Sequence, residues 1–305
     1  DSFSLFSRHY IRNPAMSTLG HQAGGIVGFL SNLGKLVDLI RPRITLVIWE
    51  SGGSPRRRAI FPDYKKGRKP PKLNRYYEDI PDSDGNRIHQ VRFLVDTLKH
   101  VGVCQMFIED CEADDVIGFI CRNRFNDEKK VIASSDRDFY QLLDENTTIF
   151  SFTSDSFVGP ADVTSRFNIA PMNFALAKAV TGDPSDAIPG VEGIGFKSLA
   201  KRFDLISEQR DIDWLVERSR SLQAASKKPP KLFGQIIDER KLISRNLRVM
   251  YLDMAGLSAS QIRKIDAAID SFDPKRNKMH LMRALKDEGL ASFDVHSFFS
   301  AFKTI

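Results

Sequence analysis

Cys111-Glu112-Ala113-Asp114-Asp115-Val116-Ile117-Gly118 carries three carboxylates within four residues, just where an apolar helix should begin. The segment before it, residues 103–108, is short and apolar, as in a β-strand. Strands that alternate with helices are typical of an α/β fold. Open α/β sheets bind ligands at the carboxyl ends of their strands, so this acidic junction is a candidate site.

Two further acidic pairs lie later in the chain. Asp136 and Asp138 follow the apolar run 131–133, and Asp183 and Asp186 lie in Gly182-Asp183-Pro184-Ser185-Asp186. Carboxylates gather in such numbers only when cations hold them, and Mg²⁺ takes oxygen ligands while leaving positions for phosphate. The pattern therefore indicates a phosphodiesterase that uses two metal ions.

Each acidic cluster also has a purely structural explanation. Carboxylates in the first turn of a helix cap its free N–H groups and complement its dipole. For any single cluster this explanation is at least as good as a metal site. Two of the clusters follow predicted strands, however, and this shared location favours a metal centre.

Outward from the acidic junction, apolar runs of strand and helix length alternate. Residues 25–40 repeat apolar side chains at helical spacing. Residues 44–49 form a continuous apolar run that predicts a strand buried on both faces, and it ends at Glu50, a further acid. Helices are also expected at 87–100 and 139–143, and strands at 131–133 and 148–152. We therefore expect an α/β fold with a mainly parallel central sheet.

From about residue 171 the pattern becomes almost wholly helical. Helices are expected at 174–180, 194–203, 212–221, 232–242 and 293–305, and the short apolar segment 247–252 is expected to interrupt them. We place a boundary near residue 170, between an α/β domain over 1–170 and a helical subdomain over 171–305.

The composition excludes several classes of protein. The chain has 305 residues, of which 42% are hydrophobic and 28% charged, as in an ordinary globular protein. The longest apolar stretches are of strand length, so no transmembrane helix is expected. Cys104, Cys111 and Cys121 have neither zinc spacing nor the even number of a disulfide framework, which fits a reducing cytoplasm.

Positive charge is concentrated in one segment. The net charge is +6, and nine Lys and Arg between Arg56 and Arg75 are interrupted by a single acid, Asp63. Residues 51–86 are also rich in Pro and Gly, which predicts a long irregular excursion. A basic segment together with an acidic metal site suits a polyanionic substrate, although a solvated surface loop remains the alternative.

The order of these features resembles the 5′ nuclease family. This family includes bacteriophage flap endonucleases and the 5′-3′ exonuclease domain of bacterial DNA polymerase I. The resemblance covers residue 1 to roughly residue 250. It rests on Tyr64-Lys65-Lys66-Gly67-Arg68, on Glu112-Ala113-Asp114-Asp115, on Asp136-Arg137-Asp138 and on the segment from Gly182 to Gly195.

The resemblance implies a PIN-like or resolvase-like nuclease domain and a role for each motif position. Lys65, Arg68 and Arg57 are expected to be catalytic, the first two at the scissile phosphate. The expected ligands of two Mg²⁺ ions, which Mn²⁺ could replace, are Asp1, Glu50, Glu112, Asp114, Asp115, Asp136, Asp138, Asp183 and Asp186. Glu50 stands where the family usually has Asp. The family also has a strand before Asp1, so we expect native sequence to precede this residue.

The segment from Gly190 to Ser198 resembles a helix-hairpin-helix, expected at about residues 188–203, which holds duplex DNA without reading its sequence. Its glycines let the backbone approach a phosphate, and its second helix offers free N–H groups. The expected DNA contacts are Tyr64, Lys66, Lys69, Gly193, Gly195 and Lys197, and the expected K⁺ ligands are the carbonyls of Val191 and Ile194. Tyr64 either stacks on a base or packs inside the protein, and the sequence leaves both open.

The resemblance thus implies a structure-specific 5′ nuclease, a flap endonuclease or 5′-3′ exonuclease, for branched, 5′-flap or 5′-ended DNA or for RNA primers in hybrids. Residues 51–86 would form an arch over the site. The expected setting is replication and repair, as a monomer away from membranes, in the cytoplasm of a bacterium or phage-infected cell. Two alternatives are a PIN-like ribonuclease and a non-catalytic DNA-binding protein. The hairpin segment disfavours the first, and the complete acidic set disfavours the second.

Overall fold

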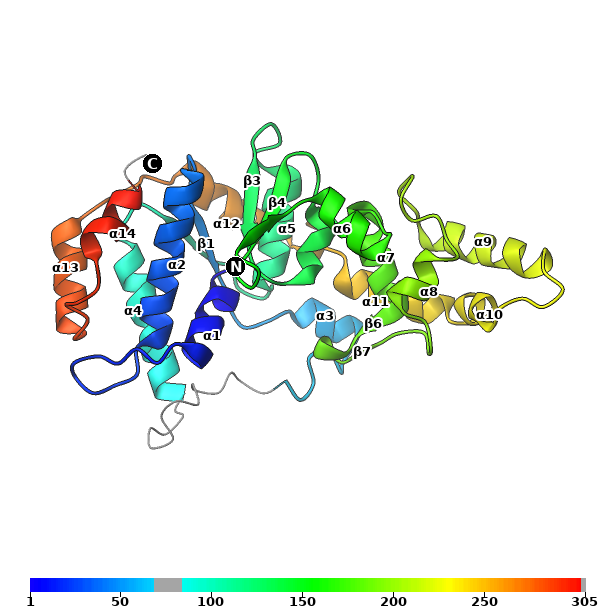
Figure 1. Cartoon of the computed structure of the whole chain (residues 1–305), viewed down its shortest axis with the longest axis horizontal. Coiled ribbons are helices and arrows are strands. Elements are labelled where there is room, and N and C mark those ends of the chain that lie inside the picture. The colour runs from blue at the N-terminus through cyan, green and yellow to red at the C-terminus, as the bar shows by residue number, and fades with distance from the viewer. Residues whose placement is uncertain (69–83, 303–305) are drawn as a thin grey trace. The chain divides into compact units, whose positions relative to one another are not determined.

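The computed structural model describes residues 1–68 and 84–302, and the chain divides into two units (Figure 1). Unit 1 comprises Asp1–Ser51, Lys69–Glu109 and Ala259–Ile305. Unit 2 comprises Gly52–Arg68 and Asp110–Ser258.

Unit 1 is built on a pair of parallel strands. The apolar run after residue 44 forms β1 (Leu46–Trp49), which pairs with β2 (Cys104–Phe107) in the register Leu46 to Cys104. Val47, Ile48 and Trp49 are buried, as expected for a strand covered on both faces. Because parallel strands need a crossover, the chain between β1 and β2 returns through α4 (Asp84–Leu98).

Helices complete unit 1. At its N-terminal end, α1 (Ser2–Arg12) packs against α2 (Gly24–Ile40). The C-terminal part of the chain adds α12 (Ala259–Asp270) against β2, α13 (Lys278–Asp287), and α14 (Val295–Ala301) against α2. Helix α14 confirms the helix expected near the C-terminus, over a shorter range.

The strands of unit 2 form a separate three-stranded sheet. Strand β3 (Lys130–Ala133) pairs in parallel with β4 (Thr147–Ser151), and β5 (Ser156–Val158) adds in antiparallel. The helix that starts at the acidic junction is α5 (Ala113–Asn123), and η1 (Arg137–Leu142) is a 3₁₀ helix after β3. Two shorter helices, α3 (Pro55–Ile60) and α6 (Pro160–Phe167), belong to the same unit.

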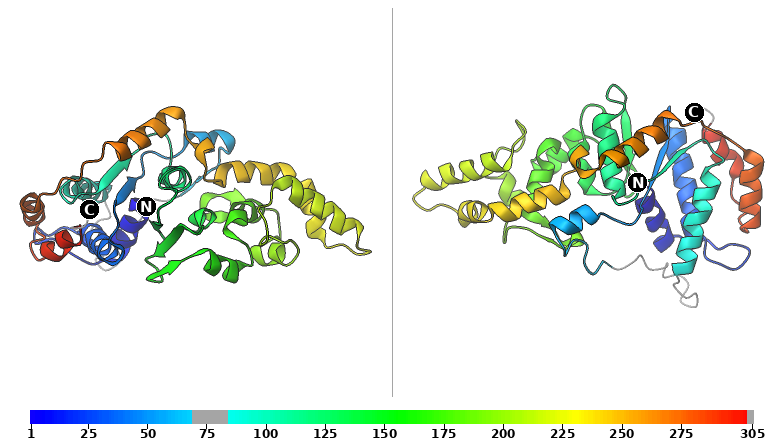
Figure 2. Two further views of the ribbon diagram at one scale, coloured as in Figure 1. Left: turned by 90° about the horizontal axis from the view of Figure 1, so that it is seen from above. Right: turned by 180° about the vertical axis from the view of Figure 1, so that it is seen from behind.

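Downstream of residue 170, unit 2 is mainly helical. Helix α7 (Pro171–Thr181) leads into a short antiparallel pair, β6 (Gly182–Asp183) and β7 (Ile188–Pro189), with η2 (Pro184–Asp186) between the two strands. The remaining helices are α8 (Phe196–Ala200), α9 (Ile212–Ala224), α10 (Lys231–Asp238) and α11 (Arg240–Met250), followed by η3 (Met254–Gly256). Both views of Figure 2 show α9 and α10 packed side by side.

The α/β fold and the parallel pairings expected from the sequence are confirmed, although the described strands lie in separate sheets. The expected interruption at residues 247–252 is wrong, because Leu247 to Met250 form the last turn of α11. Asn246 explains why this segment stays helical: its amide donates to the carbonyls of Ala179 and Pro189, which fixes α11 against α7.

Three further expectations concern the segment 51–86, membrane-spanning helices and the domain boundary. The segment 51–86 is not irregular throughout, because Ser54 caps α3 and residues 84–86 already belong to α4. No helix in the described ranges has the length and hydropathy needed to cross a membrane. The domain boundary near residue 170 remains a prediction.

Candidate metal centre

The acidic junction of unit 2 begins with Glu112 at the N-terminus of α5. The carboxylate of Asp115 accepts a hydrogen bond from the Glu112 N–H at 3.2 Å, so it caps the helix as the structural explanation predicts. Both side chains are nevertheless buried, with 3% exposure for Glu112 and 1% for Asp115. Buried carboxylates need partners of opposite charge.

Arg57 supplies much of that charge. Its Nη1 and Nη2 atoms donate to the two carboxylate oxygens of Asp115 at 2.6 and 2.7 Å, and Nη1 also donates to Glu112 at 3.1 Å. Its Nε donates to the Val249 carbonyl at 2.8 Å, and the side chain is 3% exposed. Arg57 therefore holds two carboxylates in place from inside the protein, which is a positioning role.

Oε2 of Glu112 is the point where three donors converge. It accepts hydrogen bonds from the Tyr64 hydroxyl at 2.9 Å, from Lys65 Nζ at 2.8 Å and from Arg57. Burial favours the neutral acid, but Arg57 and Lys65 outweigh it and lower the pKa of Glu112. The carboxylate is therefore ionised and available to a cation.

Tyr64 connects this cluster to a second acidic motif. Its hydroxyl oxygen lies 3.4 Å from Oδ2 of Asp186 as well as 2.9 Å from Glu112. The ring is buried with Phe61, Ile188, Val249 and Met250. Tyr64 thus packs in the protein interior in this structure, and base stacking remains a prediction.

Lys65 lies on the same side of the cluster as Asp186. Its backbone N–H donates to the Asp186 carbonyl at 2.9 Å, and the residue has a left-handed φ of 55°. Such a backbone is uncommon for a residue other than glycine and is found at functional sites. Arg68 Nη1 lies 3.8 Å from Oδ1 of Asp186, and its side chain is 58% exposed. Both cations are therefore near the acids, and Arg68 remains open to solvent.

The second acidic group gathers Asp138, Asp183 and Asp186, whose carboxylate oxygens lie within 4.8 Å of one another. Local hydrogen bonds orient two of the acids of these motifs. Asp136 accepts from the Asp138 N–H at 2.8 Å, and Asp183 accepts from the Ser185 N–H and hydroxyl at 2.9 and 2.6 Å. Capping and clustering therefore occur together, with the cap fixing how each carboxylate points.

Lys178 lies among these acids and was not identified from the sequence. Its ammonium contacts Oδ1 of Asp138 and lies 2.7 Å from Oδ2 of Asp183, with 9% of the side chain exposed. Burial alone would lower the pKa of Lys178, but the two carboxylates outweigh it and raise the pKa. The available signal was that Lys178 is the single charged residue in the apolar segment of α7.

The electrostatics of the acids favour a bound cation. Burial raises the pKa of Asp138 to about 6, since the nearby Lys178 offsets it only in part. Burial and the neighbouring Asp136 carboxylate raise the pKa of Asp114 well above its ordinary value. These acids repel one another in the absence of further positive charge. The atoms that these acids offer to a metal are all carboxylate oxygens. Mg²⁺ and Mn²⁺ prefer oxygen ligands, so the residues fit such ions.

The contacts given above do not include four of the expected site residues. Asp1 and Glu50 belong to unit 1, where Asp1 caps α1 by accepting from the Ser4 N–H at 3.0 Å and Glu50 follows β1. Their assignment as metal ligands stays a prediction. Lys66 is exposed and pairs with Asp63 at 2.8 Å, and Lys69 lies outside the described residues.

The expected hairpin segment, residues 188–203, contains β7, the turn over residues 190–195 and α8. Gly193 has a left-handed φ of 73°. In the described part of the chain, no heavy atom beyond the adjacent residues lies within 4 Å of where a Cβ of Gly193 or Gly195 would be. The Ile194 N–H donates to the Val191 carbonyl at 3.2 Å. Lys197 is exposed in the first turn of α8. The turn therefore leaves its backbone open, and its role in DNA and K⁺ binding remains a prediction.

Comparison with known proteins places these features in a wider group. A family model described as "5'-3' exonuclease, N-terminal resolvase-like domain" matches residues 1–168. A 5′-3′ exonuclease of Buchnera aphidicola subsp. Acyrthosiphon pisum is 29% identical over 259 residues, which cover 83% of this chain and 85% of that protein. DNA polymerase I of Deinococcus radiodurans is 30% identical over 258 residues, or 83% of this chain but 25% of the polymerase.

Solved structures share the fold. A zinc-bound structure of T5 5′-exonuclease superposes with a TM-score of 0.64 at 22% identity, covering 94% of this chain and 96% of that one. A bacteriophage T5 D15 flap endonuclease in complex with DNA and metal ions gives 0.60 at 19% identity, covering 99% and 97%. At these identities the likeness concerns the fold.

Proposed function

This chain belongs to the 5′-3′ exonuclease family and is a metal-dependent, structure-specific 5′ nuclease, and we propose that it cuts branched, 5′-flap or 5′-ended DNA. The observation that carries the proposal is the contact of the Tyr64 hydroxyl with Glu112 and Asp186, which joins two acidic motifs of unit 2 in one site.

The proposed ligands of two Mg²⁺ ions follow the acidic motifs. Glu112, Asp114 and Asp115 supply one set, and Asp136, Asp138, Asp183 and Asp186 the other. By motif position the proposal extends to Asp1 and Glu50. Bound there, divalent ions would lower the pKa of water and stabilise charge on the reacting phosphate. Arg57 would keep the carboxylates of Asp115 and Glu112 in their orientation through its hydrogen bonds to both.

Lys65 and Arg68 are proposed to contact the scissile phosphate. Arg68 is exposed and suits a phosphate oxygen through its planar guanidinium. Lys65 is bound to Glu112, and a ligand that takes up the Glu112 charge would free its ammonium for the phosphate. Both residues therefore have the position and charge to stabilise a developing phosphate anion.

Duplex DNA is proposed to bind the hairpin segment of unit 2. Gly193 and Gly195 leave the backbone open to phosphate, Lys197 adds a charge, and the carbonyls of Val191 and Ile194 are offered to K⁺. The basic residues Lys66 and Lys69, with residues 51–86 as an arch, would hold the single-stranded arm. Tyr64 would reach DNA only after leaving its buried position.

The proposed setting is replication or repair in the cytoplasm, with flaps or RNA primers as natural substrates and the chain acting as a monomer. The decisive experiment compares a 5′-flap DNA with a single-stranded RNA of the same sequence while Mg²⁺ is titrated. We expect Mg²⁺-dependent cutting of the flap and little cutting of the RNA. Preference for the RNA would contradict the proposed substrate.

A further inference from the structure

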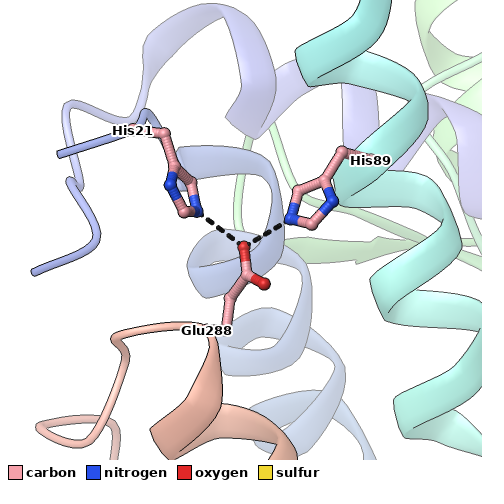
Figure 3. A group of neighbouring side chains, drawn as sticks. All are labelled: His21, His89 and Glu288. Atoms are coloured by element: carbon pink, nitrogen blue, oxygen red, sulfur yellow. Dashed lines mark hydrogen bonds and ion pairs between the residues drawn. The ribbon is translucent and has the colours of Figure 1, made fainter. Parts of the chain in front are cut away.

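Unit 1 contains a second group of side chains that could hold a metal ion, and the proposed nuclease reaction gives this group no part (Figure 3). His21 comes from the loop between α1 and α2, His89 from α4, and Glu288 from the C-terminal end of α13. From these residues, we propose that unit 1 binds one transition-metal dication, Zn²⁺ above all, through His21, His89 and Glu288.

The three side chains place their potential metal ligands close together. Nε2 of His21 lies 2.8 Å and Nε2 of His89 lies 2.7 Å from the same oxygen, Oε1 of Glu288. The two rings meet at 88° with their centroids 5.6 Å apart, so they do not stack on each other. In Figure 3 both imidazoles point toward the carboxylate between them.

The charges of the cluster leave room for a cation. Glu288 is 7% exposed, and among the described residues its side chain contacts these two imidazoles. A dication bound by the same three atoms would give this buried carboxylate a partner of opposite charge.

The donor types select the metal. Two imidazole nitrogens and one carboxylate form a set that suits zinc and related ions, whereas Mg²⁺ prefers oxygen. Side-chain exposures of 33% for His21 and 50% for His89 leave a position for water. In a tetrahedral zinc site with bonds of about 2.0–2.1 Å, neighbouring ligand atoms are about 3.3 Å apart. Each imidazole must therefore move roughly half an ångström away from Oε1 of Glu288, which the exposure of both rings permits.

The surroundings hold the three segments in place without the metal. The Ser17 hydroxyl donates to the Glu288 carbonyl at 2.5 Å, and the Ser17 N–H donates to the His21 carbonyl at 2.9 Å. On the other side, the Gln90 amide donates to the carbonyl and side chain of Gln22 at 2.8 and 2.7 Å. Hydrogen bonds therefore hold the backbone of Glu288 and His21 and the neighbour of His89 in place. A bound ion would join the loop, α4 and α13 at one point.

The test uses the full chain, stripped of metal and kept in millimolar Mg²⁺ to occupy the acidic site. Zinc chloride is titrated by calorimetry, and cobalt chloride by visible absorption, because tetrahedral Co²⁺ absorbs far more strongly than octahedral Co²⁺. We expect one equivalent of Zn²⁺ and a tetrahedral cobalt spectrum. His89→Ala should lower the zinc affinity by at least about tenfold, as loss of a direct ligand costs no less than loss of its hydrogen-bond partner.

Two further variants separate the site from general zinc binding. Glu288→Gln keeps a polar side chain but removes the charge and should also weaken zinc. His280→Ala is the matched control, because His280 is an exposed histidine of unit 1 that does not belong to the cluster. Its ring centroid lies 4.9 Å from that of His100. Zinc should raise the Tm of wild type and of His280→Ala but not of His89→Ala.

The opposite results would overturn the site. If the wild type bound no zinc, the three residues would form a hydrogen-bonded cluster only. Equal zinc affinities of His89→Ala and wild type would also contradict the site. So would equal losses of zinc affinity in His89→Ala and His280→Ala. None of these results depends on cleavage of DNA.

Discussion

Nζ of Lys178 lies 2.7 Å from Oδ2 of Asp183, five residues further along the chain. The pair is largely buried, with side-chain exposures of 9% and 16%. The ammonium also contacts Asp138, so a protein cation already lies among the acids proposed to bind the second metal. Lys178 therefore lowers the repulsion between these carboxylates when no ion is bound.

Replacing Lys178 by Met should destabilise the metal-free protein. The change keeps the volume of the side chain but leaves two partly buried carboxylates without their cation, and loss of one partner of such a pair costs about 3 kcal/mol. Urea unfolding in EDTA measures the free energy, and Mg²⁺ should restore part of it. Lys66→Met is the control, because an ion pair as exposed as that of Lys66 and Asp63 contributes little to stability. Equal losses for the two variants would contradict this role.

Asp183→Asn should abolish cleavage while leaving DNA binding intact. Asparagine can still cap η2 through its side-chain oxygen, but it removes a negative charge from the proposed metal set. Asp136→Asn should behave alike. Single-turnover cleavage in Mg²⁺ and DNA affinity in Ca²⁺ measure the two effects. Asp162→Asn is the matched control, since Asp162 accepts from the Gly159 N–H in an exposed cap. Normal cutting by Asp183→Asn would show that the metal assignment is wrong.

Lys65→Ala should slow the chemical step by about 10²–10³ with little change in DNA affinity, because it removes a charge near the reacting phosphate. Lys129→Ala removes an exposed lysine of unit 2 to which no role is assigned, and it should leave the single-turnover rate close to wild type. Rapid-quench measurements at saturating enzyme separate chemistry from binding. An effect of Lys65→Ala confined to binding would remove this residue from the catalytic set.

Arg57→Lys should weaken both folding and metal binding. Lysine keeps the charge but cannot make the two parallel hydrogen bonds to Asp115 or the bond to the Val249 carbonyl, so we expect a loss of about 3 kcal/mol. Chemical denaturation and Mn²⁺ titration measure the two effects. Arg58→Lys, at an exposed position of α3, should be close to neutral. If Arg57→Lys unfolds like wild type, the positioning role is wrong.

Acid should destabilise the fold in part through His9. Burial, helped by the charge of Arg8, lowers the pKa of His9 to about 4. Because the unfolded imidazole has a pKa of about 6.5, the unfolded state binds more protons between these values, and stability falls as the pH drops from 6.5 toward 4. Urea unfolding at pH 7 and pH 5 should show a smaller drop for His9→Gln than for wild type. Equal drops would show that His9 does not contribute.

The sequence predicted the elements that have a strong local pattern. The apolar runs before Glu50 and before Asp136 form β1 and β3, because a strand of a parallel sheet is apolar at consecutive positions. The segment 247–252 was misassigned because a short apolar run fits a strand and a buried helix equally well. Lys178 was not identified from the sequence, since one of its two partners, Asp138, is 40 residues away in the chain. Arg57 was named only through the family resemblance, since its partners Glu112 and Asp115 are 55 and 58 residues away.

The acids of the candidate centre were expected to be either caps or metal ligands, and the structure joins the two descriptions. Asp115, Asp136 and Asp183 each accept a hydrogen bond from a backbone N–H near their own position in the chain. Selection for folding alone would therefore preserve these residues in a relative that had lost its activity. Lys65 and Arg68 cap no helix, so their presence or loss is the better guide to which relatives still cut nucleic acid.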